Sequence, residues 1–259
     1  MNDPIAALVR QHDPDRFLTA LFAPPEKRQA LLTLYAFNHE LARAREVASE
    51  PTLALIRLQW WREVVEGEAK RHEVATPLIE AIRNGMLDPD DLLAIVDARE
   101  TEADDRIETT DVWRTWLLAG AGGLVVAAGR LLGAPEPEAL RPFGAAFAVS
   151  GLLRGVPVLA AQGRCLLPAD LLAEHGLVPE AVISDPNAAG MLDVGRALVR
   201  EGERFLAAGP PVKGARAWIA AMLPAVLARR DLARWPRIDR PRRFGDRWAV
   251  TYHGLTGRI

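Results

Sequence analysis

Apolar residues recur along almost the whole chain at the three-to-four-residue spacing of an α-helix. In the segment after Pro25, for example, Leu31, Leu34 and Leu41 fall on one face. No stretch alternates between apolar and polar residues as a half-buried strand would, and no change of composition marks a domain boundary. The chain of 259 residues is therefore expected to be one all-α domain with a sizeable core.

Proline, glycine and capping residues between the periodic segments predict where the helices begin and end. The expected helices cover about 25–49, 52–67, 77–84, 89–104, 111–132, 136–160, 169–175, 186–208 and 215–230. Pro157 is expected to interrupt the helix over 136–160. The helical domain is thus assigned to residues 1–230. Residues 231–259 form a tail containing arginine and tryptophan, expected either to be solvated or to dock on an anionic membrane or a partner.

Glycines are concentrated in the two most apolar helices, over 111–132 and 136–160. Each glycine inside a helix costs about 1 kcal/mol relative to alanine. Several of them together indicate that something packs close to the backbone. Both a neighbouring helix and a ligand fit this pattern.

Composition excludes several classes of function. A net charge of -2 gives no reason to expect a nucleic acid partner. The single cysteine, Cys165, cannot form an internal disulfide, which favours a reducing cytoplasm. The N-terminus has no signal-peptide pattern, and the longest apolar runs fall short of the ~20 residues that span a bilayer. We therefore expect a cytoplasmic protein with at most peripheral membrane contact, and the excess of arginine over lysine suggests a bacterial source.

Three motifs occur in order along the chain. The first consists of residues 16–18 (RFL), 21–28 (LFAPPEKR) and 34–37 (LYAF), and the second of residues 56–62 (IRLQWWR). The third consists of residues 152–154 (LLR) and 163–172 (GRCLLPADLL). Together they resemble the squalene and phytoene synthases over roughly residues 13–230. The resemblance implies an isoprenoid-synthase-type helical bundle around a central cavity.

The resemblance also implies where a metal site would lie. These synthases join two prenyl diphosphates head to head, with magnesium held by carboxylates four residues apart on two facing helices. The corresponding positions here are Ala42 and Glu46 in the first helix, and Gly155 and Leu159 in the second. Only Glu46 could bind a metal, so we expect no magnesium site, no other cofactor and no catalytic residue.

The retained motifs without their aspartates resemble one branch of this family. That branch includes the mitochondrial complex I assembly factor of phytoene-synthase type and its bacterial relatives. The resemblance implies a non-catalytic protein whose partner is a respiratory-complex subunit or an isoprenoid or other lipid, near the inner membrane. The alternative is a divergent magnesium-dependent prenyl transferase that joins two farnesyl or geranylgeranyl diphosphates, using Glu46 and other ligands.

Basic and polar residues near the motifs are candidates for lining the cavity or binding an anion, because guanidinium groups match phosphate oxygens. The candidates are Tyr35, His39, Arg57, Arg62, Arg154 and Arg164. The arginines could equally pair within the chain, with Glu46, Glu63 or Asp170.

Overall fold

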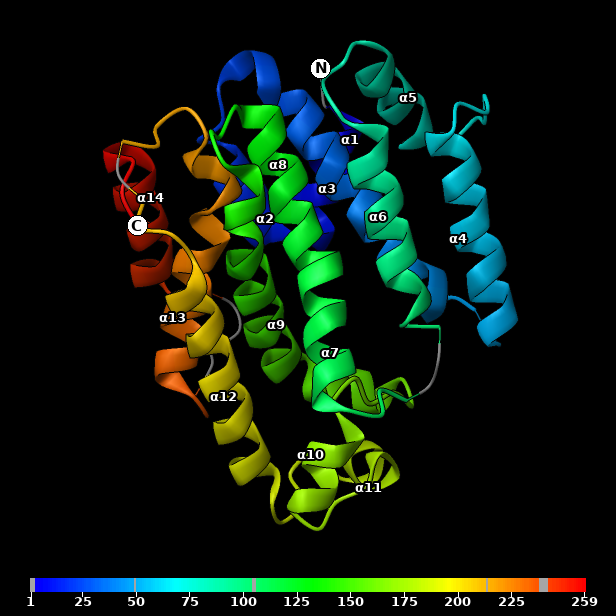
Figure 1. Cartoon of the computed structure of the whole chain (residues 1–259), viewed down its shortest axis with the longest axis vertical. Helices are drawn as coiled ribbons and strands as arrows, with labels where there is room; N and C mark the ends of the chain where they lie inside the picture. The colour runs from blue at the N-terminus through cyan, green and yellow to red at the C-terminus, as the bar shows by residue number, and fades with distance from the viewer. Residues whose placement is uncertain (1–2, 49, 104–105, 213, 238–241) are drawn as a thin grey trace.

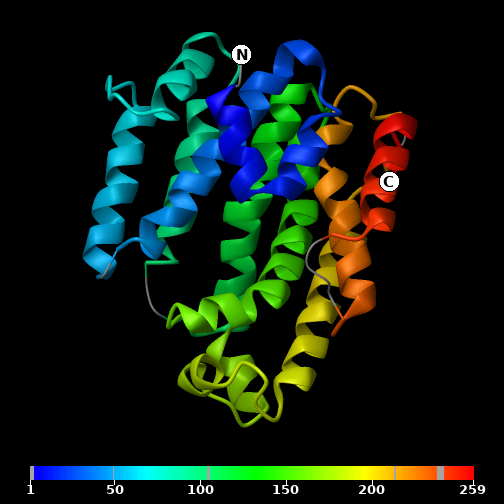
Figure 2. The ribbon, with the colours of Figure 1, turned by 180° about the vertical axis from the view of Figure 1, so that it is seen from behind.

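The structure, a computed structural model, describes residues 3–48, 50–103, 106–212, 214–237 and 242–259. Within these ranges the regular elements are helices, and the β-type pairing found is one isolated bridge between Ile107 and Pro168. Figures 1 and 2 show the helices packed side by side, with α9 in the interior of the bundle. The predicted all-α fold is confirmed.

The N-terminal half consists of α1 (Pro4–His12), α2 (Pro14–Ala20), α3 (Pro25–Glu46), α4 (Pro51–Val65), α5 (Ala75–Arg83) and α6 (Pro89–Glu100). Most of these helices have proline in the first turn, where no backbone N–H is needed. Side chains of Asp3, Asp13 and Asp88 cap α1, α2 and α6. The first two helices were not predicted. The predicted ends at Ser49 and Asp104 lie outside the described residues.

The next stretch runs through α7 (Thr110–Leu117), the π-helical η1 (Leu118–Gly122) and α8 (Gly123–Leu132) without a break. A 3₁₀ turn, η2 (Pro137–Leu140), leads into α9 (Arg141–Ala161). The two helices predicted over 111–132 and 136–160 are therefore present. The π-helical turn falls on the glycine-rich segment, where the wider turn is accommodated without side-chain crowding.

The C-terminal part contains α10 (Ala169–Glu174), α11 (Pro179–Ser184), α12 (Met191–Ala208), η3 (Ile219–Ala221), α13 (Leu223–Arg234) and α14 (Phe244–Thr256). Helix α14 packs against α13 and α2. It lies at the outer edge of the bundle beside α13 in both views (Figures 1 and 2). The C-terminal tail thus adds a helix to the bundle.

Three predictions about helix boundaries were wrong. The helix expected over 215–230 begins at Leu223 as α13, after the 3₁₀ turn η3. Pro157 does not interrupt α9, which continues to Ala161. The proline is exposed and lies close to the end of the helix, so few hydrogen bonds follow it. Asp185 does not open a helix, because its side chain accepts a hydrogen bond from the N–H of Asn187 and forms a turn. Helix α12 begins at Met191, after Gly190 with φ 98°.

The core described by the structure has two large apolar clusters and a small one of three alanines. One large cluster is centred on α3, α8 and α13, and the other on α7, α9 and α12. The fully buried Trp113 belongs to the second cluster and donates its indole N–H to the carbonyl of Leu166 at 3.1 Å. Helix α9 contacts η1, α12 and α13, so it connects the two clusters.

Two helical stretches, Thr110–Leu132 and Pro137–Ala161, are long and apolar enough to cross a membrane, although the sequence suggested shorter apolar runs. Within the bundle, 72% and 50% of their most apolar windows are buried. Core helices of globular proteins can also have this length and apolar composition.

Candidate functional site

A cavity of about 900 Å³ opens between the N-terminal helices, η1 and α9. Its apolar wall includes Phe17, Trp116, Phe147 and Leu152. Its polar wall contains six arginines and three carboxylates, namely Arg10, Arg16, Arg99, Arg154, Arg242, Arg247, Asp13, Asp15 and Glu102. The cavity therefore combines an apolar surface with a concentration of basic groups.

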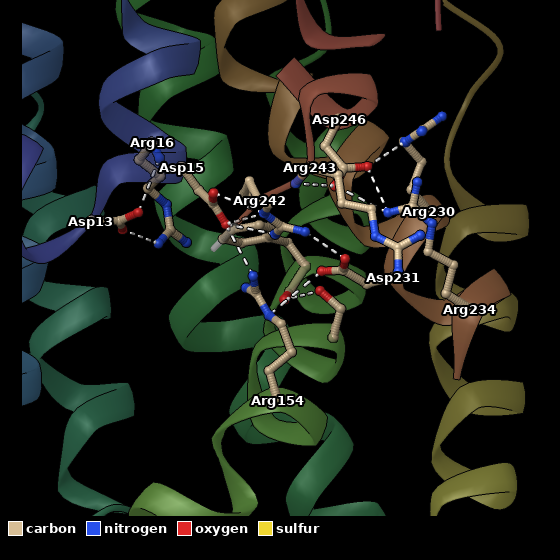
Figure 3. A network of polar contacts seen from close by, with 12 residues as sticks. Asp13, Asp15, Arg16, Arg154, Arg230, Asp231, Arg234, Arg242, Arg243 and Asp246 are labelled. Carbon is tan, nitrogen blue, oxygen red and sulfur yellow. Dashed lines mark hydrogen bonds and ion pairs between the residues drawn. The ribbon is translucent and has the colours of Figure 1, made fainter. Parts of the chain in front are cut away.

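Three of the charged residues that line this cavity, Asp15, Arg154 and Arg242, form one network with Asp231, which does not line it (Figure 3). Arg242, just before α14, donates to Asp15 of α2 at 2.6 Å and also to Asp231 of α13. Arg154 of α9 lies 3.3 Å from Asp15 and 3.5 Å from Asp231. All four side chains are largely buried. The network therefore ties three helices and the C-terminal segment together beneath the cavity.

Burial and the neighbouring arginines shift the pKa values of the two carboxyls of this network in opposite directions. Burial alone would raise the pKa of Asp15, but the hydrogen bonds and charges of Arg242 and Arg154 outweigh it, so the pKa is lowered. Burial dominates at Asp231, where the pKa is raised despite the same two arginines. Asp15 is thus the carboxylate that the arginines hold ionised most strongly.

The opposite wall is built from a second set of paired groups. Arg99 donates to the side-chain oxygen of Asn38 at 2.7 Å and also pairs with Glu102. Trp116 donates its indole N–H to Glu102 at 3.2 Å. Near α2, Arg16 pairs with Asp13 at 2.7 Å. Most of the arginines at the cavity are therefore neutralised by carboxylates of the same chain.

Two of the cavity arginines stand apart from these pairs. Arg10 and Arg247 are exposed, and within the part of the chain that the structure describes no ion pair is found for either. They leave the cavity with an excess of positive charge. An anionic group entering the cavity would meet these two side chains without displacing an existing partner.

The structure separates the candidate residues predicted from the motifs. Arg154 lines the cavity, and Arg164 approaches it through a hydrogen bond to the carbonyl of Glu102 at 3.5 Å. Tyr35 is buried in the core, where burial raises the pKa of its hydroxyl. His39 stacks on the cavity residue His12 with ring centroids 4.4 Å apart. Burial and the neighbouring His12 lower the pKa of His39, which favours a neutral ring.

The two remaining arginines lie elsewhere. Arg57 lines a separate pocket of about 380 Å³ between α3 and α4, together with Trp60 and His72. Arg62 pairs with Asp97 at 2.6 Å and with Glu100 at 2.7 Å. Pairing within the chain therefore holds for Arg62 and Arg154, although with partners other than the three expected.

The residues at the family's metal positions do not fit a magnesium site. Ala42, Gly155 and Leu159 are half-buried and offer no side-chain oxygen, while Glu46 is exposed. None of the four lines the cavity. Within the described ranges, no group of three or more His, Cys, Asp or Glu side chains is placed to hold a metal ion. One exposed carboxylate cannot supply the several oxygen ligands that magnesium diphosphate requires.

Sequence reasoning missed most of the cavity's charged residues. Asp15 and Arg242 lie 227 positions apart in the chain, so no local pattern connects them. Asp13 and Arg16 offered a weak signal, because Asp13 precedes Pro14 as a helix cap would. The residues that form the network come from segments outside the three motifs, apart from Arg154.

Two solved structures resemble the fold. A dehydrosqualene synthase in complex with ligand superposes with a TM-score of 0.75 at 15% identity, covering 96% of this chain and 94% of that chain. A squalene synthase from Alicyclobacillus acidocaldarius gives a TM-score of 0.66 at 19% identity, covering 88% and 90%. These likenesses establish the isoprenoid-synthase-type helical fold.

Sequence comparison identifies closer relatives. The chain is 29% identical to complex I assembly factor 6 of Rattus norvegicus and of Homo sapiens over 181 residues, which is 67% of this chain and 54% of each relative. It is 26% identical to the homologue of that factor in Drosophila melanogaster, over 68% of this chain and 57% of the relative. The chain thus spans about half the length of the relatives it matches. Residues 9–251 match the squalene/phytoene synthase family, and the chain belongs to that family.

Proposed function

We propose that this chain is a non-catalytic member of its family that supports the assembly of respiratory complex I. The observation that carries the proposal is the replacement of metal-binding carboxylates by Ala42, Gly155 and Leu159, at positions that do not line the cavity. Without a cluster of carboxylates, the charge of a departing diphosphate cannot be neutralised by magnesium. The divergent prenyl transferase is the alternative that this observation disfavours.

The relatives support the second half of the proposal. The proteins that match over two thirds of this chain are named as assembly factors of NADH dehydrogenase (ubiquinone) complex I. We place the chain in the bacterial cytoplasm, at the periphery of the inner membrane, with a subunit of the respiratory complex as its partner.

The retained cavity supports a related role in binding an anionic amphiphile such as an isoprenoid. Its apolar wall suits a hydrocarbon chain, and Arg10 and Arg247 supply positive charge that carboxylates do not neutralise. Binding of such a molecule requires no metal and is compatible with an assembly factor.

The purified protein is expected to release no diphosphate from farnesyl or geranylgeranyl diphosphate, with or without magnesium. The reason is the missing ligand set, because one exposed glutamate cannot assemble a cluster of several magnesium ions. Phosphate release coupled to a pyrophosphatase measures this beside an active squalene synthase. Binding of the prenyl diphosphate without release of diphosphate supports the role in binding an amphiphile. Release of diphosphate together with a C30 or C40 product would show that the chain is an enzyme.

Deletion of the gene in the organism that encodes the chain separates the two functions in the cell. We expect the NADH:quinone oxidoreductase activity of isolated membranes to fall several-fold, because unassembled subunits do not form the complex. The content of C30 and C40 isoprenoids should stay unchanged, and the wild-type gene should restore the activity. A loss of isoprenoids with normal oxidoreductase activity contradicts the assembly role.

A further inference from the structure

Helix α14 presents a stripe of large apolar side chains to solvent. Phe244 is 83% exposed, Trp248 63%, Tyr252 57% and Leu255 65%. Their spacing of four, four and three residues places them on one face of the helix. The opposite face carries the buried Val250. A globular protein rarely exposes several aromatic residues in a row on one helix unless that face is covered by something else.

Contacts near both ends of α14 fix which face of the helix is exposed. Asp246 is buried and accepts hydrogen bonds from Arg230 at 2.7 Å and from Arg234 at 2.8 Å (Figure 3). Farther along, Gly254 packs so closely on Phe22 that an added Cβ would lie 2.4 Å from its ring. Both ends of α14 are therefore anchored, and the aromatic stripe points away from the bundle.

Among the described residues, exposed arginines lie on or next to α14. Arg247 of α14, Arg258 just after it and Arg216 beside Gly257 are exposed. Within the described part of the chain no ion pair is found for these three residues. Asp246, the acidic residue of the helix, is buried and neutralised by two arginines. The chain carries a net charge of -2, so this positive surface is a local feature.

We propose that the exposed face of α14 docks on the surface of an anionic lipid membrane. Aromatic rings favour the interface between headgroups and acyl chains, and arginines beside them are attracted by anionic headgroups. The arginines beside the stripe favour an anionic membrane over an uncharged apolar partner, because only an anionic surface attracts their positive charge. The inference rests on the peripheral location proposed above and names the surface that provides it.

The position of α14 gives this contact a consequence for the cavity. Arg247 both belongs to α14 and lines the cavity, and Arg242 precedes the helix and lines it as well. A membrane bound at α14 would therefore lie close to the basic wall of the cavity. An anionic amphiphile could then pass from the bilayer to the cavity over a short distance.

Sedimentation with lipid vesicles tests the proposal on the whole chain. We expect binding to vesicles of phosphatidylcholine mixed with phosphatidylglycerol, and at least several-fold weaker binding to phosphatidylcholine alone. Replacing both Trp248→Ser and Tyr252→Ser should weaken binding by about tenfold or more. Arg258→Gln should weaken it by about fivefold, and added salt should remove the difference from the wild type.

A matched control uses two apolar residues outside this helix. Val178→Ser with Leu192→Ser removes side chains of similar exposure, and it should change vesicle binding by less than about twofold. Circular dichroism shows whether each variant remains folded.

Three outcomes overturn the inference. They are no binding of the wild type to anionic vesicles, equal binding of the serine double variant, and a wild-type dimer that the same variant converts to a monomer. The last would assign the face to a second copy of the chain. If the protein binds vesicles as expected but the deletion strain has normal oxidoreductase activity, the membrane-docking proposal stands and the assembly role is rejected. If the protein does not bind vesicles but the deletion strain loses oxidoreductase activity, only the membrane-docking proposal is rejected.

Discussion

Replacing Arg242 by alanine is expected to lower the free energy of unfolding by about 3–5 kcal/mol. The guanidinium of Arg242 bonds Asp15 and Asp231, and both carboxyls are largely buried. Without it, Arg154 is the one arginine among the described residues that still pairs with them, at 3.3 Å from Asp15 and 3.5 Å from Asp231. A buried charge that loses its partner costs more than the original pair contributed, because it cannot regain its hydration.

Urea denaturation followed by circular dichroism measures this loss. Arg247→Ala provides the control, because Arg247 also lines the cavity but is exposed and outside the network. It should change stability by less than about 0.5 kcal/mol. A combined Asp231→Asn and Arg242→Gln variant should lose less free energy of unfolding than Arg242→Ala alone, since it removes a negative charge together with the positive one. Equal stability of the Arg242→Ala and Arg247→Ala variants would show that the network contributes little.

The network also explains what occupies the polar side of the cavity. Asp15 and Asp231 form ion pairs with Arg154 and Arg242 of the same chain. Under the function proposed above, this cavity binds an apolar chain beside paired arginines and carboxylates, and it uses no magnesium. This combination suits a binding protein better than a catalyst of diphosphate departure.

The regular part of this fold was predictable because helical periodicity is a local property. The helices predicted over 25–49, 111–132 and 136–160 correspond to α3, the α7–α8 stretch and α9, with small differences at their ends. The motifs in these segments also indicated the family and its bundle. Periodicity failed for α1, α2 and α11, since each spans at most nine residues and too few turns to show a pattern. It also failed for α14, a helix of 13 residues in the segment interpreted as a tail, because its large apolar residues lie on the exposed face and do not mark a core.

The site was less predictable than the fold. Arg154 could be identified from the motif that contains it, and the structure places it at the cavity. Its partners could not, because Asp15, Asp231 and Arg242 come from segments that meet only after the chain has folded. Arg57 and Arg62 belong to the second motif, but α4 directs Arg57 to another pocket and Arg62 to α6. Proximity in sequence therefore did not establish proximity to the cavity.

From the sequence, either a neighbouring helix or a ligand could pack against the glycines of the central helices. Gly120 lines the cavity, whereas Gly144 of α9 touches the backbone of η1. A Cβ added at Gly144 would lie 2.1 Å from the carbonyl oxygen of Ala121 and 2.8 Å from the Cα of Gly122. Both explanations, a neighbouring helix and space for a ligand, thus apply, each to a different glycine.

Gly144→Ala is accordingly expected to lower the free energy of unfolding by about 3 kcal/mol or more. The clash is with backbone atoms of η1, which cannot rotate away as a flexible side chain would, so α9 must move as a unit. Helix α9 connects the two core clusters, and its displacement disturbs packing in both. Urea denaturation measures the loss, and circular dichroism confirms that the helix content is retained.

Gly151→Ala is the matched control, because it makes the same substitution two turns later in the same helix. No atom lies within 4 Å of a Cβ added at Gly151, so the change costs no packing. Helix propensity alone should then stabilise this variant by up to about 1 kcal/mol. The two variants should therefore move in opposite directions. If Gly144→Ala were as stable as Gly151→Ala, the close approach of α9 and η1 would have no energetic weight, and the glycine at position 144 would need another explanation.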